Sequence, residues 1–195
     1  MLSFFAIVIG VVSLRYAIPH VPFPTPIPNF RLRHPWLIAH AITASIALLI
    51  GPWQFFSGFR ARHMTVHRWF GRVYCIAVTA AWLTSLPIAA HAQFGAVSSA
   101  GFLTLGLFWI TSTAFGYFTI RQGQVTRHRE WMIRSYALTA AAITLRIYLP
   151  IATLSGIQIP VAYPAIAWLC WIPNLLFAEY IIRKTRGNTL IAAQA

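Results

Sequence analysis

Residues 60–74 read RARHMTVHRWFGRVY, and residues 121–136 read RQGQVTRHREWMIRSY. The two segments share one pattern of Arg, Thr, His-Arg, Trp, Arg and Tyr, and a single inserted residue, Glu130, separates their registers. Each copy lies between two long apolar runs. A polar segment between two apolar helices is the connection of a helical hairpin, so the repeat predicts two similar hairpins.

The composition places these hairpins in a membrane. The chain has 195 residues, of which 58% are hydrophobic and 9% are charged, whereas soluble domains carry about 25% charged residues. A helix needs about 20 mostly apolar residues to span a bilayer. Six segments meet this requirement: roughly 2–18, 36–57, 69–90, 98–120, 131–152 and 163–182. Because they leave no room for a soluble domain, we predict an all-α polytopic membrane helix bundle of about six transmembrane helices.

The whole chain, residues 1–195, is predicted to be one membrane domain with an internally duplicated four-helix core. Six prolines in one stretch force extended, polyproline-like backbone, which indicates a linker outside the bilayer. The predicted parts are a first helix (1–18), a proline-rich outer linker (19–35), a five-helix bundle (36–182) that contains repeats 36–90 and 98–152, and a tail (183–195).

Positive charge dominates the chain and orients it. Lys and Arg number 15 against two acidic residues, Glu130 and Glu179, and the formal net charge is +13. Positive residues gather on the cytoplasmic side of membrane spans. Eleven lie near the repeated segments and in the tail, and four lie at the opposite ends. We therefore predict a multi-pass protein of the inner (cytoplasmic) membrane with both termini cytoplasmic. Nucleic-acid binding is not expected, because no soluble platform presents a basic face.

Thr65 and Thr126 are predicted to be helix N-caps, which would place both His-Arg pairs in the first turn of a helix. The N-terminus of a helix is partially positive, so cations are unfavourable there. Two such placements predict a compensating anion. The candidates are a lipid phosphate, a haem propionate or an acidic side chain such as Glu179.

Each copy also pairs an aromatic residue with an arginine. Trp69 and Arg72 are three residues apart, and so are Trp131 and Arg134. Residues with this spacing are neighbours on one face of a helix, so each guanidinium is expected to lie over its indole ring.

Polar side chains inside membrane spans are costly and indicate a function or a specific partner. Glu179 is expected to pair with Arg183, or to reach Arg72 or Arg134 instead. Structural roles suggested for the others are a helix cap for Gln54, snorkelling to the outer interface for Arg146 and a helix–helix hydrogen bond for Asn174.

The histidines suggest a haem. Neutral imidazole ligates haem iron, and helical bundles build such sites from facing helices. His67 and His128 are the predicted axial ligands, and Gly71, one turn beyond His67, leaves room for a flat macrocycle. His40 would serve the outer side as a ligand or proton relay, or it is a satisfied interior residue. The residues expected to hold anionic groups of the cofactor are Arg68, Arg72, Arg129 and Arg134.

Longer motifs carry a family resemblance. They are His40 with Gly51-Pro52-x-Gln54-Phe55, then His67-Arg68-x-x-Gly71-Arg72-x-Tyr74, and His128-Arg129-x-Trp131-Met132-Ile133-Arg134. On these motifs, from about residue 34 to Glu179, the chain resembles bacterial multi-pass membrane proteins catalogued as domain of unknown function 2306. More distantly it is similar to b-type cytochromes, which use His ligands on four consecutive helices. It departs from that pattern because its fourth and sixth spans contain no His.

Two hypotheses of function follow. The first is a redox-linked membrane protein that holds b-type haem against the paired His and Arg residues, with a quinone or quinol as its redox partner. The second is a non-enzymatic scaffold or transport protein whose Arg/His cluster binds lipid phosphate or a small anion. The bilayer itself and its anionic lipids are expected partners.

Overall fold

The computed structural model describes residues 6–10 and 30–192, and every regular element in those ranges is helical. A short helical segment covers residues 6–10. The others are α2 (Phe30–Ile50), the 3₁₀ helix η2 (Gly51–Phe55), α3 (Ser57–Arg62), α4 (Met64–Ala90), α5 (Ala96–Arg121), α6 (Val125–Thr139), α7 (Ala141–Leu154), α8 (Ile159–Leu169) and α9 (Ile172–Ala192). The predicted all-α fold is confirmed.

Five stretches of the described residues are long and apolar enough to cross a membrane. They are Pro35–Phe55, Met64–Ala90, Ala96–Arg121, Val125–Leu154 and Ile159–Gly187. They match the last five predicted spans, whereas most of the predicted first helix and most of the proline-rich linker lie outside the described residues. Large apolar side chains such as Ile76 and Leu107 are exposed on the outside of the bundle, as expected where lipid is the solvent.

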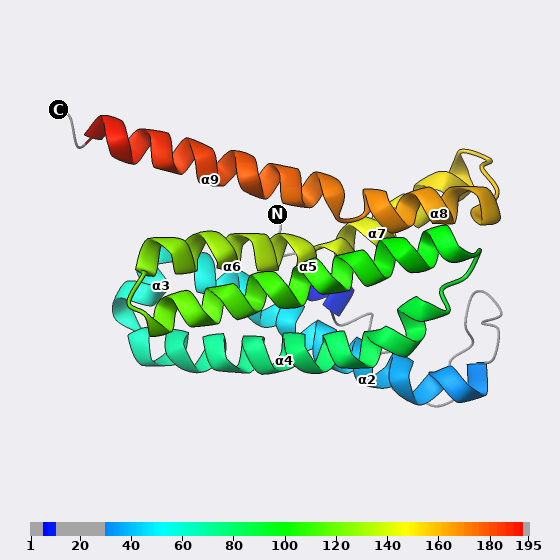
Figure 1. Cartoon of the computed structure of the whole chain (residues 1–195), viewed down its shortest axis with the longest axis horizontal. Coiled ribbons are helices and arrows are strands. Elements are labelled where there is room, and N and C mark those ends of the chain that lie inside the picture. The colour runs from blue at the N-terminus through cyan, green and yellow to red at the C-terminus, as the bar shows by residue number, and fades with distance from the viewer. Residues whose placement is uncertain (1–5, 11–29, 193–195) are drawn as a thin grey trace.

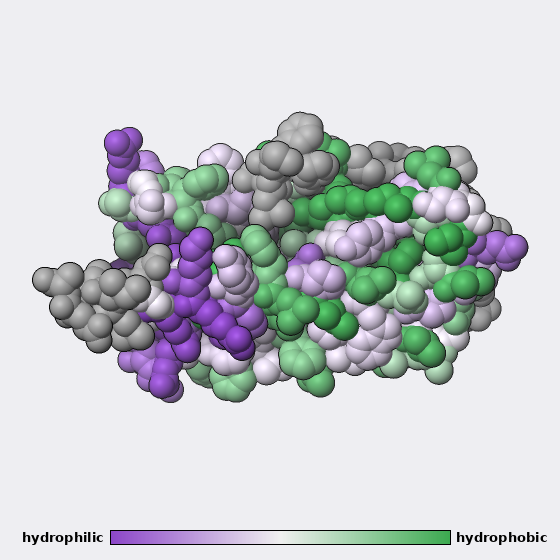
Figure 2. All heavy atoms as spheres, turned by 90° about the horizontal axis from the view of Figure 1, so that it is seen from above, coloured by the Kyte–Doolittle hydropathy of each residue, from purple (hydrophilic) through white to green (hydrophobic). Residues whose placement is uncertain are grey.

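The helices form antiparallel hairpins (Figure 1). Helix α2 packs along α4, α5 packs along α6, and α4 joins the two hairpins by packing against α5. Helix α8 packs against α5 and α7, and α9 returns along α6. One end of the bundle collects α3, the starts of α4 and α6, and the later part of α9. We call it the arginine-rich end, and hydrophilic side chains gather there beside a mostly apolar surface (Figure 2).

Prolines explain two departures from straight spans. Pro52 has no N–H to donate, and the chain continues from α2 as the 3₁₀ helix η2, as expected near this residue. Pro173 cannot donate to the Leu169 carbonyl. The predicted span 163–182 is therefore two helices, α8 and α9, which meet at residues 170–171.

Two further boundaries differ from the prediction. The span predicted at 131–152 is divided at Ala140 into α6 and α7, where the Ile143 amide bonds the Ala140 carbonyl in a tighter, 3₁₀-type turn. Helix α9 continues to Ala192, so most of the segment predicted as a tail, 183–195, is helical.

A buried hydrogen-bond network joins three helices at the centre of the bundle. The Tyr74 hydroxyl, on α4, lies 2.8 Å from Ser135 Oγ and 2.7 Å from Thr139 Oγ1, both on α6. From α5, Thr113 Oγ1 lies 2.7 Å from Ser135 Oγ, and Trp109 donates its indole N–H to Thr139 Oγ1 at 2.9 Å. Because a bilayer offers no water to buried hydroxyls, these groups satisfy one another.

Both acidic residues hold α9 to α6. Arg134 donates to Glu179 through two bonds, Nε to Oε1 at 2.5 Å and Nη2 to Oε2 at 3.0 Å. Arg186 donates to Glu130 in the same two-pronged way, with Nε 2.5 Å from Oε1. Such paired bonds fix geometry as well as charge. Of the partners expected for Glu179, Arg134 is therefore the one that forms an ion pair.

The central network generates a prediction about stability. Tyr74→Phe removes the hydroxyl that bonds Ser135 and Thr139, and it should lower the free energy of unfolding by about 1 kcal/mol. Thermal unfolding of the purified protein in detergent measures the change. Tyr117→Phe, at an exposed tyrosine of α5, is the matched control and should leave the stability unchanged. Equal stability of the two variants would contradict the role given to the network.

The Arg134–Glu179 pair can be tested by a double-mutant cycle. Arg134→Gln and Glu179→Gln should each destabilise the protein, and the coupling energy between them should be about 1 kcal/mol, since the two side chains are close and partly shielded from solvent. Denaturant titrations in detergent give the four free energies. A second cycle with Arg72→Gln in place of Arg134→Gln should show no coupling to Glu179→Gln, because Arg72 is exposed on α4. Coupling in both cycles, or in neither, would refute the specific pairing.

Candidate functional site

The two repeated segments start their helices in the same register. Helix α4 begins at Met64 and α6 at Val125, so His67 and His128 are each the fourth residue of a helix. Both therefore lie at the arginine-rich end, near the N-termini of helices that cross the bundle in the same direction (Figure 1).

The predicted threonine caps are wrong. The N-cap positions are His63 and Gln124, and neither makes a side-chain capping bond. The first copy shows why: the His63 amide closes α3 on the Phe59 carbonyl, and the His63 carbonyl already accepts the His67 amide. Backbone bonds thus start α4 directly after α3, and Thr65 falls inside the first turn.

His67 and His128 act on each other electrostatically, and their Nδ1 atoms differ in hydrogen bonding. The groups close enough to act electrostatically on His67 are His128, Arg60 and Arg68. His128 donates its Nδ1–H to the Gly116 carbonyl at 2.7 Å, which leaves Nε2 with its lone pair. In contrast, His67 Nδ1 is buried without a hydrogen-bond partner among the described residues.

A third polar group, Gln54, lies at the same end of the bundle, against α4 at Gly71. Its side chain is 7% exposed, and its Nε2 has no hydrogen-bond partner among the described residues. Its Oε1 would lie 3.9 Å from a Cβ added to Gly71, and no other atom would be nearer. A Cβ would therefore fit beside α4 one turn beyond His67 without a clash. We call His67, His128 and Gln54 the inner polar cluster.

Because of the inserted Glu130, the two Trp–Arg pairs point towards different surroundings. Helix α6 is continuous through the insertion, so each later motif residue is rotated by about 100° relative to His128. Arg72 lies 5.1 Å from the centre of the Trp69 ring and is exposed, whereas Arg134 lies 4.6 Å from that of Trp131 and faces α9. The predicted stacking is confirmed in both copies, but only Arg134 reaches an acid.

The remaining predicted site residues lie in different places. Arg68 is exposed beside His67, and Arg129 is exposed on the side of α6 that faces α9. His40 donates its Nδ1–H to the Ala81 carbonyl at 2.9 Å and has Arg146 as a charged neighbour. It lies ten residues before the end of α2, about 15 Å along the helix axis. His40 is therefore not part of the inner polar cluster.

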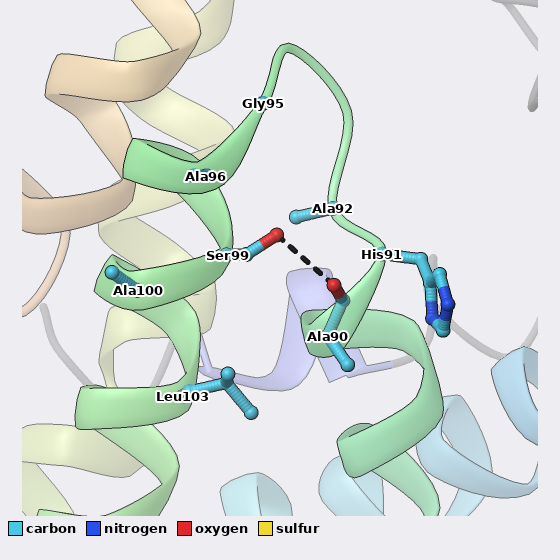
Figure 3. Close-up of a pocket in the computed structure, with 8 residues that line it drawn as sticks. All are labelled: Ala90, His91, Ala92, Gly95, Ala96, Ser99, Ala100 and Leu103. Carbon is cyan, nitrogen blue, oxygen red and sulfur yellow. Dashed lines mark hydrogen bonds between the residues drawn. The ribbon is translucent and has the colours of Figure 1, made fainter.

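A cavity of about 630 Å³ opens at the opposite end of the bundle, in the turn between α4 and α5 (Figure 3). It is lined mainly by small residues, and the Ser99 hydroxyl in it donates to the Ala90 carbonyl at 3.3 Å. The His91 side chain points away from Ser99 and bonds the Pro87 carbonyl. The residues that line this cavity bring together no set of reactive groups.

Other polar groups have structural partners. Asn174 donates to Thr144 Oγ1 at 2.8 Å and to the Ala137 carbonyl at 3.3 Å, as its predicted helix–helix bond requires. Neither Cys75 nor Cys170 is in a disulfide. Within residues 6–10 and 30–192, no group of three or more His, Cys, Asp or Glu side chains could hold a metal ion.

Three features of the molecule were not predicted from the sequence. They are the Glu130–Arg186 pair, the orphaned amide of Gln54 and the network around Tyr74. The tyrosine that closes each repeated motif was a signal for the last of these, since both Tyr74 and Tyr136 are buried. The other two depend on which face of α6 meets α9 and on how η2 turns inward, which sequence spacing does not encode.

Comparison with known proteins agrees with the expected family. A family model described as "Predicted membrane protein (DUF2306)" matches residues 37–182. No curated protein and no solved structure matches the chain. The match runs from the first turns of α2 to the middle of α9, so it includes the inner polar cluster and both repeated segments. The chain belongs to this DUF2306 family of membrane proteins.

Proposed function

We propose that this membrane protein is redox-linked and holds a b-type haem between His67 and His128. The observation that carries the proposal is that two imidazoles occupy corresponding positions at the starts of α4 and α6, near enough for His128 to act electrostatically on His67, and that one of them has Nδ1–H bonded to a backbone carbonyl. Histidines that ligate a metal usually donate their other ring N–H in this way. His128 therefore has the tautomer that ligation through Nε2 requires.

The residues present fit this group in donor chemistry. His67 Nδ1 and Gln54 Nε2 are buried and orphaned, and Gly71 leaves space beside them. The Gln54 side chain borders that space. It is unbranched and has several rotatable bonds, so it can turn aside when a flat macrocycle enters.

The arginines then take separate roles. Arg60 and Arg68, the charged neighbours of His67, are proposed to hold the propionate groups. Arg134 is committed to Glu179, Arg72 lies over Trp69 and Arg129 faces α9, so these three are less suited to that task. When bound, a haem of this kind accepts and releases single electrons. A lipid-soluble quinone or quinol is the proposed partner, because it shares the bilayer with the site.

We place the arginine-rich end in the cytoplasm of a bacterium, on the strength of the excess of Lys and Arg there. His40 would then serve the outer half of the bundle. Its Nδ1–H is bonded to the Ala81 carbonyl, which leaves Nε2 available to accept a proton or ligate a metal. Arg146 would supply a positive charge beside it.

The spectrum of the purified protein tests the proposal. Protein made in haem-sufficient cells and purified in mild detergent should be pigmented, with a reduced-minus-oxidised spectrum of a b-type cytochrome. His67→Ala and His128→Ala should each lose this signal. His63→Ala, at an exposed histidine of the same end, is the control and should keep it.

A folded but colourless protein would remove the haem proposal and favour the alternative, a non-enzymatic scaffold or transport protein whose arginines bind lipid phosphate or a small anion. Colour that persists in both histidine variants would show that His67 and His128 are not the haem ligands.

The space beside Gly71 gives a second test. Gly71→Leu should fill the space that the macrocycle needs and reduce the haem-to-protein ratio about tenfold or more, whereas Gly71→Ala meets no atom nearer than 3.9 Å and should raise stability by up to about 1 kcal/mol through helix propensity. Haem content and thermal unfolding are measured on both variants. Full haem content in a folded Gly71→Leu variant would contradict the assigned position.

A further inference from the structure

A groove of about 410 Å³ lies between α6 and α9 at the arginine-rich end. It is formed by the face of α6 that carries Arg129 and by the antiparallel stretch of α9 that carries Arg186. In Figure 2 the hydrophilic side chains of this end adjoin the apolar surface of the bundle. The groove thus lies where water, lipid head groups and lipid chains meet.

The groove has two levels. Arg129 and Arg186 lie at the outer level, and Ile133 and Ile182, each four residues away on the same helix, lie at the inner level. Four residues make one helical turn, so the two levels are about 6 Å apart. Because α6 and α9 run in opposite directions, both isoleucines lie on the bilayer side of their arginines. An occupant therefore meets guanidinium groups first and apolar side chains deeper in.

The charges around the groove favour an anion. Arg129 and Arg186 line it, and Arg127 acts electrostatically on Glu130, whereas the second nearby carboxylate, Glu179, is held by Arg134. Glu130 also lines the groove, but it is 7% exposed and already accepts bonds from Arg186 Nε and Nη2. The Nη1 donors of Arg186 therefore remain available to bind an anion. Arg129 makes no ion pair with the described residues.

We propose that this groove binds an anionic phospholipid, with the phosphate between Arg129 and Arg186 and an acyl chain along Ile133 and Ile182. Arginine holds phosphate through paired, charge-assisted hydrogen bonds. The isoleucines of the inner level offer the acyl chain an apolar surface on which to be buried. Free phosphate would leave the inner level unfilled. The proposal is independent of the haem, since it uses a different face of α6 from His128.

Native mass spectrometry tests this on the full-length protein in mild detergent. Phosphatidylglycerol and phosphatidylcholine with identical acyl chains are added separately, and the bound fraction of each is titrated. Phosphatidylglycerol should bind more tightly, and Arg129→Gln should weaken it about tenfold, the effect of losing roughly one charge-assisted bond. Arg62→Gln, an exposed arginine of α3 at the same end, is the matched control and should bind like the unchanged protein.

Three results would overturn the site. Equal binding of the two lipids would remove the requirement for net negative charge. An equal loss in Arg129→Gln and Arg62→Gln would reduce the effect to diffuse attraction by the whole basic end. Displacement of phosphatidylglycerol by inorganic phosphate in excess would identify a site for the anion alone, without an acyl chain. Because haem content is read from the same samples by absorbance, failure of the lipid site and of the haem proposal are distinguishable.

Discussion

The bundle depends on one constraint: inside a bilayer, a polar group must find its partner within the protein. Tyr74, Thr113, Ser135 and Thr139 meet this requirement together, so that α4, α5 and α6 are fixed to one another by hydroxyls rather than by apolar packing alone. Asn174 does the same between α9 and the α6–α7 segment. Among the described residues, the buried polar atoms without a partner are Gln54 Nε2 and His67 Nδ1 at the arginine-rich end and Ser98 Oγ on α5. At the arginine-rich end two such atoms occur together, and an outside group there would complete the bonding.

The inserted residue Glu130 is the main difference between the two repeated segments. Without it, the second Trp–Arg pair would keep the same angular relation to His128 that the first has to His67. With it, Arg134 turns towards α9 and meets Glu179, while Glu130 itself meets Arg186. One residue therefore converts a lipid-facing segment into an attachment site for another helix. The histidines precede the insertion and keep their shared register.

Local sequence rules predicted what depends on neighbours along one helix. Apolar length predicted the last five spans, and the three-residue spacing predicted that Arg72 and Arg134 lie over their tryptophans. Features that depend on contacts between helices were missed. Thr65 looks like a cap, but backbone bonds to His63 start the helix earlier, and the partner of Glu130 lies 56 residues away on α9. The two histidines of the candidate site were named from the sequence. Gln54 was expected only to cap a helix, because its burial depends on the inward turn of η2.

The attachment of α9 has a mechanical consequence. At one end it is joined to α8 through a two-residue break that contains no continuous helix, and along its length it is held to α6 by two ion pairs. A helix of 21 residues is about 30 Å long, so it is a lever with its pivot at residues 170–171. A rotation of a few degrees at that pivot displaces the far end between about two and three times as much as it displaces Glu179. Of the two pairs that hold the lever, Glu130 with Arg186 acts at the longer arm.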